Sequence, residues 1–424
     1  MSGDSRTIER ATEWLGRATD RRFFLAVFIP VAAVYLATTT WGIGINIDPL
    51  TNTYTAWALG TSGTPIVDEY QVPDTHRTFL TWLGAHDQGG SISTYPPGAA
   101  VVAAPLYAAF ARDLDESTLR RTAAEVEDLD PITVVHPEVW PGSVAAALSA
   151  AAGVGFLGLT FRSLTTTSGA IAGSAVVAFG TSVWGVASDA LWQHGPSLMW
   201  LCLSIWLAQS QRWWGAGFAL AAALMSRQLT GVVAAAIGIG AAIGHRSFGP
   251  MIRVGLASSL GAVGLSAWYW RWFGTPAPWG ARDAQVESAV TAPIADVTFA
   301  GDIGGPFSLL ENQLLGLFDL RFGVFVLTPI LLVALIGVPR AWRIAPATVR
   351  AAFVGGIVYY LVQHRIQIYA HSGYLGYRYP LEAFVAMAPM WFLAARSAFD
   401  RVPLPSRWAV GISVAIHAVL AVLG

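Results

Sequence analysis

The chain has 424 residues and a formal net charge of −1, with 54% hydrophobic and only 12% charged residues. Soluble domains carry about 25% charged residues, so this composition excludes an ordinary soluble domain. Apolar runs close to the roughly 20 residues that cross a bilayer recur along the sequence. They predict an all-α polytopic membrane protein.

The first predicted span is residues 23–42, which follow the polar segment 1–22. This run is long for the apolar part of a signal peptide, and no A-x-A cleavage pattern follows it. Further single spans are predicted at 142–161, 169–187, 191–209, 254–273, 322–338, 351–369, 380–395 and 408–424.

Two apolar regions leave the topology open, and the arginines decide between the alternatives. Residues 98–111 either cross the membrane or stay in a loop, and 213–244 form either one long helix or two short ones. Cytoplasmic loops carry an excess of Lys and Arg. Most arginines fall inside and most acids outside only if 98–111 do not cross and 213–244 cross twice. This choice predicts about 11 spans, a cytoplasmic N-terminus and a C-terminus at the outer face.

The predicted organisation is a cytoplasmic segment, 1–22, and a single transmembrane domain, 23–424. Two large outer loops are expected at 43–141 and 274–321, and loops of this length usually carry function. The helix 98–111 belongs to the first loop, where it lies in or along the outer leaflet as a juxtamembrane helix. Pro96 and Pro97, which follow Tyr95, form its stiff entry.

Asp48 follows directly on the first predicted span, so it is expected at the outer membrane surface. A half-shielded carboxylate at this place can act as a general base. The alternative is a helix start, because Asp is a good N-cap residue and Pro49 suits the first helical position. The two interpretations are compatible.

Asp189 and His194 lie in the stretch SDALWQHGPSL, at the outer end of apolar helices. They could bind an acceptor or a metal ion. Two residues make an incomplete metal site, since catalytic zinc usually takes three protein ligands. Helix capping and interfacial packing of neighbouring tryptophans explain them equally well.

A set of arginines is expected at the outer face: Arg227, Arg271, Arg282, Arg321, Arg365 and Arg378. The guanidinium fork suits phosphate groups. Arg227 lies in the middle of 213–244, and an arginine at the bilayer centre is costly. A turn near the outer surface would let Arg227 face a cavity, whereas in one long tilted helix it would snorkel. Ordinary interface anchoring by Tyr and Arg is the alternative for Arg378 and Tyr379.

Several motifs of soluble enzymes are absent from the sequence. It contains no Walker A motif, no Gly-rich dinucleotide fingerprint after a strand, no Cys-pair metal motif and no G-x-S-x-G elbow. No basic patch suits nucleic acid. No nucleotide-sugar domain is expected inside, because the predicted cytoplasmic loops are short. If the protein uses a sugar donor, that donor has to reach the outer face, which favours a lipid-linked sugar over a nucleotide sugar.

Taken together, these segments resemble the GT-C fold glycosyltransferases, which include protein O-mannosyltransferases and the lipid A aminoarabinose transferase. Asp48 matches the catalytic aspartate of the family's first loop, and STYPPGAAVVAAPLY resembles its Tyr-Pro-Pro element. SDALWQHGPSL resembles the family's second outer loop, where members keep an acidic or His residue near the site. LLGLFDLRFGVFVLTPILL and SGYLGYRYPLEAFVAMAP resemble late segments of the family. Pro49 departs from the pattern, since many members have an acid there, and this leaves acceptor geometry and use of a divalent metal open.

The resemblance implies transfer of a sugar from a polyprenyl-phosphate donor to a glycan, lipid or protein acceptor, with Asp48 as base and inversion of configuration. The implied substrate-binding residues are Tyr95, Asp189, His194, Arg227, Arg321, Arg365, Arg378 and Tyr379. The expected location is the plasma membrane of a prokaryote, with the site facing outside. Two other functions stay open. A transporter or flippase of a lipid-linked glycan predicts inverted repeats and midplane charges, which the sequence lacks. A non-catalytic subunit of an envelope-synthesis complex would need neither Asp48 nor Arg378.

Overall fold

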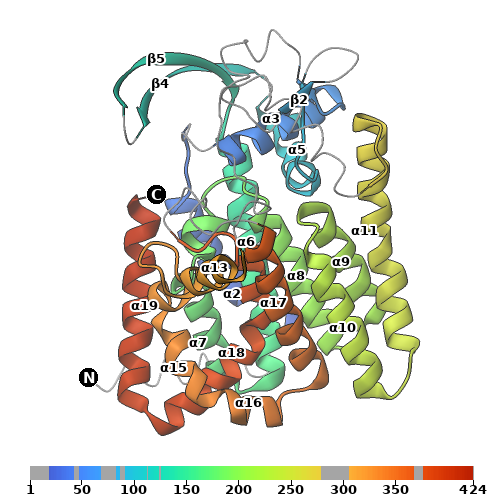
Figure 1. Cartoon of the computed structure of the whole chain (residues 1–424), viewed down its shortest axis with the longest axis vertical. Helices are drawn as coiled ribbons and strands as arrows, with labels where there is room; N and C mark the ends of the chain where they lie inside the picture. The colour runs from blue at the N-terminus through green and yellow to red at the C-terminus, as the bar shows by residue number, and fades with distance from the viewer. Residues whose placement is uncertain are drawn as a thin grey trace.

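A computed structural model of the chain describes residues 19–42, 47–67, 83–85, 91–111, 113–123, 126–277, 305–366 and 376–423. Its body is a bundle of helices, and a second layer of short helices and strands covers one end of this bundle (Figure 1). Among the described residues, four helices are long and apolar enough to cross a membrane: α2 (Asp20–Thr38), α6 (Trp140–Leu164), α11 (Gly249–Phe273) and α19 (Pro403–Leu423). This agrees with the predicted all-α membrane protein.

The rest of the bundle consists of shorter or less apolar helices. They are α7 (Thr167–Phe179), α8 (His194–Gln209), α9 (Trp213–Ser226), α10 (Thr230–His245), α13 (Gly305–Phe318), α14 (Val324–Leu327), α15 (Pro329–Ala334), α16 (Val338–Ile344), α17 (Ala347–Ile366) and α18 (Leu381–Arg401). The prediction of about 11 spans and their sidedness stays a prediction.

The middle of the bundle is packed through small residues. Helix α6 is rich in Ala, Gly and Ser, and most of its residues are buried among α2, α7 and α8. Small side chains let helix backbones approach closely, which is the usual way of packing helices in a membrane. Between α9 and α11, a Cβ on Gly261 would lie 2.4 Å from the carbonyl oxygen of Ala221, so only glycine fits this crossing.

The ambiguous run 213–244 forms two helices. Helix α9 ends at Ser226, the backbone of Arg227 is extended, and α10 begins at Thr230. The N–H of Thr230 donates to the carbonyl of Arg227, which closes the turn. The alternative of one long helix with a snorkelling Arg227 is therefore wrong.

Two predicted spans are not continuous helices. The run 169–187 breaks after α7 at Gly180 and continues as a π-helical turn, Val183–Ala187. The run 322–338 is divided at Thr328 between α14 and α15, and a 3₁₀ turn, Leu335–Gly337, precedes α16. Pro329 explains the break at Thr328, because proline has no backbone N–H to continue the hydrogen-bond ladder of α14.

The end layer is built from α3 (Ile47–Ser62), α5 (Gly98–Phe110) and two small sheets. Figure 1 looks nearly down the axis of α5 while the bundle helices run up the picture, so α5 lies across the end of the bundle. Its 13 residues extend for about 20 Å, shorter than the roughly 30 Å hydrocarbon core. Length and orientation both favour the predicted non-spanning helix.

Tyr107 ties α5 to the start of α6. Its ring belongs to the same buried apolar cluster as Ala145 and Leu191, and its hydroxyl donates to the carbonyl of Glu138 and accepts from the N–H of Gly142. Val101, Pro105 and Ala109, spaced four residues apart, are exposed, which gives α5 an apolar outer face.

No strands were expected from the sequence, but the described part of the predicted first outer loop contains five. Strands β1 (Ile66–Val67), β3 (Ser91–Ser93) and β2 (Leu83–Ala85) form one antiparallel sheet. Strands β4 (Leu114–Ala123) and β5 (Val126–Pro137) form an antiparallel hairpin that curves away from the bundle (Figure 1). The hydroxyl of Tyr54 on α3 donates to the carbonyl of Val135, which joins the base of this hairpin to the end layer. Of the second predicted outer loop, residues 278–304 lie outside the described residues.

Candidate functional site

Asp48 lies in the first turn of α3, at the end of the bundle. Its Oδ1 accepts a hydrogen bond of 2.6 Å from the hydroxyl of Tyr95, and its Oδ2 accepts one of 2.8 Å from Nη1 of Arg378. The Asp48 side chain is 21% exposed. The first loop and the segment before α18, 330 residues apart in sequence, thus meet at one carboxylate.

Tyr95 is placed by the elements on either side of it. Strand β3 ends at Ser93, whose hydroxyl accepts from the N–H of Tyr95 at 3.1 Å. Pro96 and Pro97 then lead into α5, whose first residue, Gly98, is packed so closely on α9 that a Cβ would lie 2.6 Å from the backbone of Met225. Burial, and next the Asp48 carboxylate, raise the pKa of Tyr95 well above its ordinary value, so its hydroxyl stays a donor.

Arg378 lies between two aromatic rings. Its Cζ is 4.6 Å from the centroid of the Trp192 ring and 4.7 Å from that of Tyr379, and its Nη2 donates to the Tyr379 hydroxyl at 2.8 Å. Stacking of this kind fixes the plane of a guanidinium. Burial works against the charge, but Tyr379 and Asp48 outweigh it, so the pKa of Arg378 is raised and the group stays cationic.

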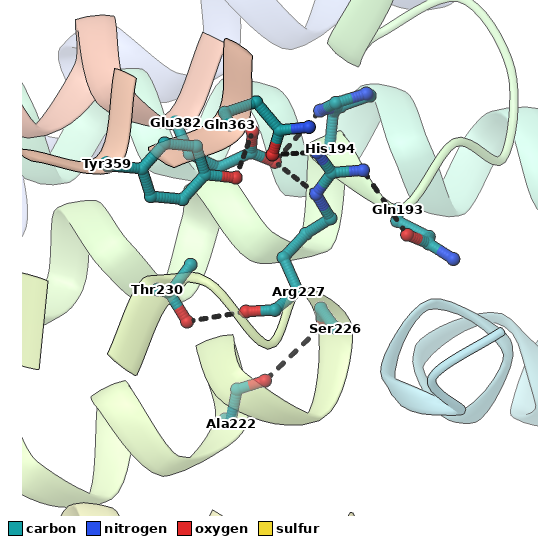
Figure 2. Close-up of polar contacts among 9 residues, drawn as sticks. All are labelled: Gln193, His194, Ala222, Ser226, Arg227, Thr230, Tyr359, Gln363 and Glu382. Carbon is teal, nitrogen blue, oxygen red and sulfur yellow. Dashed lines mark hydrogen bonds and ion pairs between the residues drawn. The ribbon is translucent and has the colours of Figure 1, made fainter. Parts of the chain in front are cut away.

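A second polar cluster is centred on Glu382, in the first turn of α18 (Figure 2). Its Oε1 lies 2.8 Å from Nδ1 of His194 and 3.6 Å from Nε of Arg227, and its Oε2 accepts from the Tyr359 hydroxyl at 3.2 Å. The carboxylate is 1% exposed. Four parts of the chain meet here: the start of α8, the α9–α10 turn, α17 and α18.

The outer edge of Arg227 has weaker contacts. Nη1 lies 3.5 Å from Oε1 of Gln193 and Nη2 lies 3.5 Å from Oε1 of Gln363, the upper limit for a hydrogen bond (Figure 2). Both glutamines are buried. The Nε of Gln193 has no hydrogen-bond partner within the part of the chain that the structure describes.

The two clusters are neighbours. Arg378 and Glu382 are one helical turn apart in sequence, and Trp192 connects them from the other side. Its ring lies against Arg378, and the ring of His194 is 6.4 Å away. A shallow pocket beside Arg378 is lined by Phe322, His364 and residues 376–380.

The structure does not bring all the predicted residues to this place. Asp189 accepts from the Thr40 hydroxyl at 2.8 Å and, through its carbonyl, from the N–H of Thr40 at 3.0 Å, so it joins the end of the first span to the turn before α8. Arg321 and Arg365 have exposed side chains. The backbone of Arg321 is nevertheless close to the Arg378 segment, because its carbonyl accepts from the N–H of Gly376 at 3.3 Å.

Sequence reasoning missed five residues of the two clusters: Trp192, Gln193, Tyr359, Gln363 and Glu382. The signal for Glu382 was present, because it is the one acid within the predicted apolar span 380–395 and follows Arg378 by a single turn. Ionisable residues within membrane spans are rare, and those that occur are usually paired with another polar group and functional.

The residues described here do not fit a metal ion. Within the described ranges, no three His, Cys, Asp or Glu side chains lie together as ligands. Asp48 is bonded to an arginine, and Glu382 to an arginine and a histidine.

No protein-family model matches this sequence, and no curated protein matches it. The structure is similar to the crystal structure of the Archaeoglobus fulgidus oligosaccharyltransferase in complex with Zn and sulfate, with a TM-score of 0.51 and 14% sequence identity. The similarity covers 94% of this chain and 52% of that one, so this chain spans about half of its structural neighbour. At this identity the likeness concerns the fold alone, and it supports the GT-C fold predicted from the sequence.

Proposed function

We propose that this chain is a membrane glycosyltransferase that transfers a sugar from a polyprenyl-phosphate donor to an acceptor hydroxyl at the outer face of the cell membrane. The observation that carries the proposal is the Asp48–Tyr95–Arg378 arrangement on a GT-C-like bundle. It combines a partly exposed carboxylate with a cation that is suited to phosphate. The acceptor is a glycan, lipid or protein.

In the proposed reaction, Asp48 takes the proton of the acceptor hydroxyl as general base. The acceptor oxygen forms a bond to the anomeric carbon while the bond from that carbon to the phosphate oxygen breaks. Polyprenyl phosphate leaves with the bonding electron pair, and a single displacement of this kind inverts the configuration. Arg378 and Arg227 stabilise the negative charge that develops on the phosphate.

Arg378 has two anionic partners in this scheme. Before the donor binds, its Nη1 holds Oδ2 of Asp48 at 2.8 Å, and Tyr95 holds Oδ1. While Tyr95 donates to Oδ1 and Arg378 donates to Oδ2, both carboxylate oxygens are engaged, so Oδ2 is not open to the acceptor hydroxyl. When the donor phosphate takes over Arg378, Oδ2 is released toward the acceptor, while Tyr95 keeps the carboxyl group in place. Donor binding thus precedes activation of the acceptor.

The test uses the purified protein in liposomes with membrane extract as the source of acceptor. A panel of radiolabelled decaprenyl-phosphate hexoses and pentoses is offered, and label in the acceptor fraction is counted. Asp48→Asn keeps size and polarity but removes the base. The matched control is Asp113→Asn, an exposed acid of the same loop. Transfer that is lost only in Asp48→Asn supports the proposal, whereas undiminished transfer removes Asp48 from the role of base.

A further inference from the structure

The Glu382 cluster contains a buried carboxylate that the reaction above does not use. Taking a charged pair out of water costs more than its attraction returns unless further hydrogen bonds satisfy it. Here His194, Tyr359 and Arg227 all point at the two oxygens of one carboxylate that is 1% exposed (Figure 2). Because these side chains come from four parts of the chain, their contacts with one carboxylate fix the position of each side chain relative to the others.

Arg227 interacts with Glu382 and Tyr359 in this cluster, and the contacts of its Nη groups with two glutamines are long. Its Nε faces Glu382, whereas Nη1 and Nη2 face the oxygens of Gln193 and Gln363 at 3.5 Å. Contacts of this length are easily exchanged. Its side chain is 16% exposed, compared with 2% for His194. The Nε edge faces a carboxylate that is 1% exposed, whereas the Nη edge has only the two long contacts, so the Nη edge is the one at which another group can replace a partner.

The surroundings of the open edge suit an anion. Gln193 is 8% exposed, and its side-chain nitrogen, on the side of the amide away from Arg227, has no partner in the described residues, so rotation of the amide would turn an unused buried donor toward Arg227 (Figure 2). Gln193 also precedes α8, whose first turn carries the partial positive charge of a helix N-terminus. A guanidinium edge, an unused amide donor and a helix start together favour a phosphoryl group.

We propose that Glu382 is a positioning residue, which holds Arg227 by its Nε edge so that the Nη edge, next to Gln193 and Gln363, binds the phosphoryl group of the polyprenyl-phosphate donor. This rests on the proposed function for the identity of the ligand. Glu382 touches no substrate and acts through Arg227. Its negative charge also keeps the buried site neutral before the donor arrives.

The experiment measures binding rather than transfer. The probe is undecaprenyl phosphate in detergent micelles, titrated into the purified full-length chain and followed by tryptophan fluorescence. Undecaprenol and inorganic phosphate are separate arms, which distinguish a lipid phosphate from either of its parts. Glu382→Gln, Arg227→Gln and the double variant are compared. Asp400→Asn is the matched control, because Asp400 forms an exposed ion pair with Arg340 at 3.4 Å.

Glu382→Gln and Arg227→Gln are each expected to weaken binding of undecaprenyl phosphate about 10-fold or more, the size of one charged hydrogen bond. The double variant is expected to bind no more weakly than Arg227→Gln alone, since residues that act as a unit are not additive. Asp400→Asn should bind like the wild type. Unchanged binding in Glu382→Gln, or losses that add in the double variant, would overturn the proposal.

A second variant keeps the test decisive if Glu382→Gln does not fold, as judged by gel filtration. Gln193→Glu leaves the Glu382 contacts intact and places a competing carboxylate at the Nη edge of Arg227. It is expected to weaken binding at least about 10-fold, the size of one charged hydrogen bond, and wild-type affinity would contradict the subsite. If the wild type does not bind undecaprenyl phosphate at all, the donor class of the proposed function fails. Binding by the wild type together with normal binding by Glu382→Gln refutes the role of Glu382 and leaves the donor class standing.

Discussion

The end of the bundle contains two versions of the same chemical set: a carboxylate, a tyrosine hydroxyl and an arginine. In the first, Asp48 has Tyr95 at 2.6 Å and Arg378 at 2.8 Å, and its side chain is 21% exposed. In the second, Glu382 has Tyr359 at 3.2 Å and Arg227 at 3.6 Å, with His194 as an additional partner, and is 1% exposed.

The two sets differ in whether the carboxylate can give up its arginine partner to another anion. Breaking a buried pair by removing one partner costs about 3–5 kcal/mol, because an uncompensated charge stays behind. Glu382 is therefore held in its contacts, whereas the partly exposed Asp48 can give up Arg378 to another anion. The accessible set is suited to chemistry, and the buried set is suited to maintaining geometry.

Among the variants of the residues that surround the two carboxylates, Arg378→Lys is expected to have the largest effect on activity. Lysine keeps the positive charge but loses the fork that bonds Asp48 and Tyr379 and stacks on Trp192. Sugar transfer should fall about 10²–10³-fold, the usual loss when one donor to a developing negative charge is removed. Arg271→Lys is the control, since Arg271 stacks on Trp272 at the end of α11. Equal activity of Arg378→Lys and wild type in the transfer assay would contradict the assignment of the Asp48 set to the chemical step.

Gly98→Ala should have the next largest effect. A Cβ at this position would lie 2.6 Å from the backbone of Met225, so the start of α5 must move away from α9 and carry Tyr95 with it. A displacement of about 1 Å at a reacting group can cost about 10²-fold in rate. Gly255→Ala on α11 is the control, because nothing lies within 4 Å of its Cβ. Comparing the transfer rates of these variants shows whether the position of α5 matters.

Tyr95→Phe is expected to have a smaller effect. The substitution removes one donor to Asp48 and keeps the ring, so about a 10-fold loss of transfer fits the loss of a charged hydrogen bond. Tyr359→Phe removes the equivalent hydroxyl from Glu382 and should raise the dissociation constant for undecaprenyl phosphate instead. If both variants changed only the transfer rate, or both changed only the dissociation constant, it would be wrong to assign chemistry to the Asp48 set and geometry to the Glu382 set.

The smallest effects are expected from Arg321→Gln and Arg365→Gln. Both side chains are exposed, and neither belongs to the two sets. Charges at such positions contribute about 0–1 kcal/mol, so transfer should change less than about 5-fold. A loss as large as that of Arg378→Lys would show that these arginines contact the donor after all.

The residues near the first set could be named from the sequence because each has a local signal. Asp48 follows a span and precedes a proline, Tyr95 precedes two prolines, and Arg378 lies between tyrosines at the start of an apolar run. Their contacts could not be predicted, because residues up to 330 positions apart meet only through packing of the end layer.

The second set was only half predicted, for a similar reason. His194 and Arg227 were singled out as polar residues at helix ends, but Glu382 lies inside an apolar run and is paired only through tertiary contacts. The β4–β5 hairpin was missed as well. Its sequence, LDESTLRRTA followed by VEDLDPITVVHP, is rich in acidic residues, which are depleted in strands. The breaks at Gly180 and Thr328 show that apolar length alone does not define a continuous helix.

The most direct test of the central claim is to measure transfer and phosphate binding together on Asp48→Asn. If Asp48 is a base that Arg378 holds until the donor arrives, transfer should fall about 10²–10⁴-fold. The affinity for undecaprenyl phosphate should be unchanged or tighter, because Arg378 loses a competing carboxylate. Undiminished transfer, or a parallel loss of transfer and binding, would contradict the account.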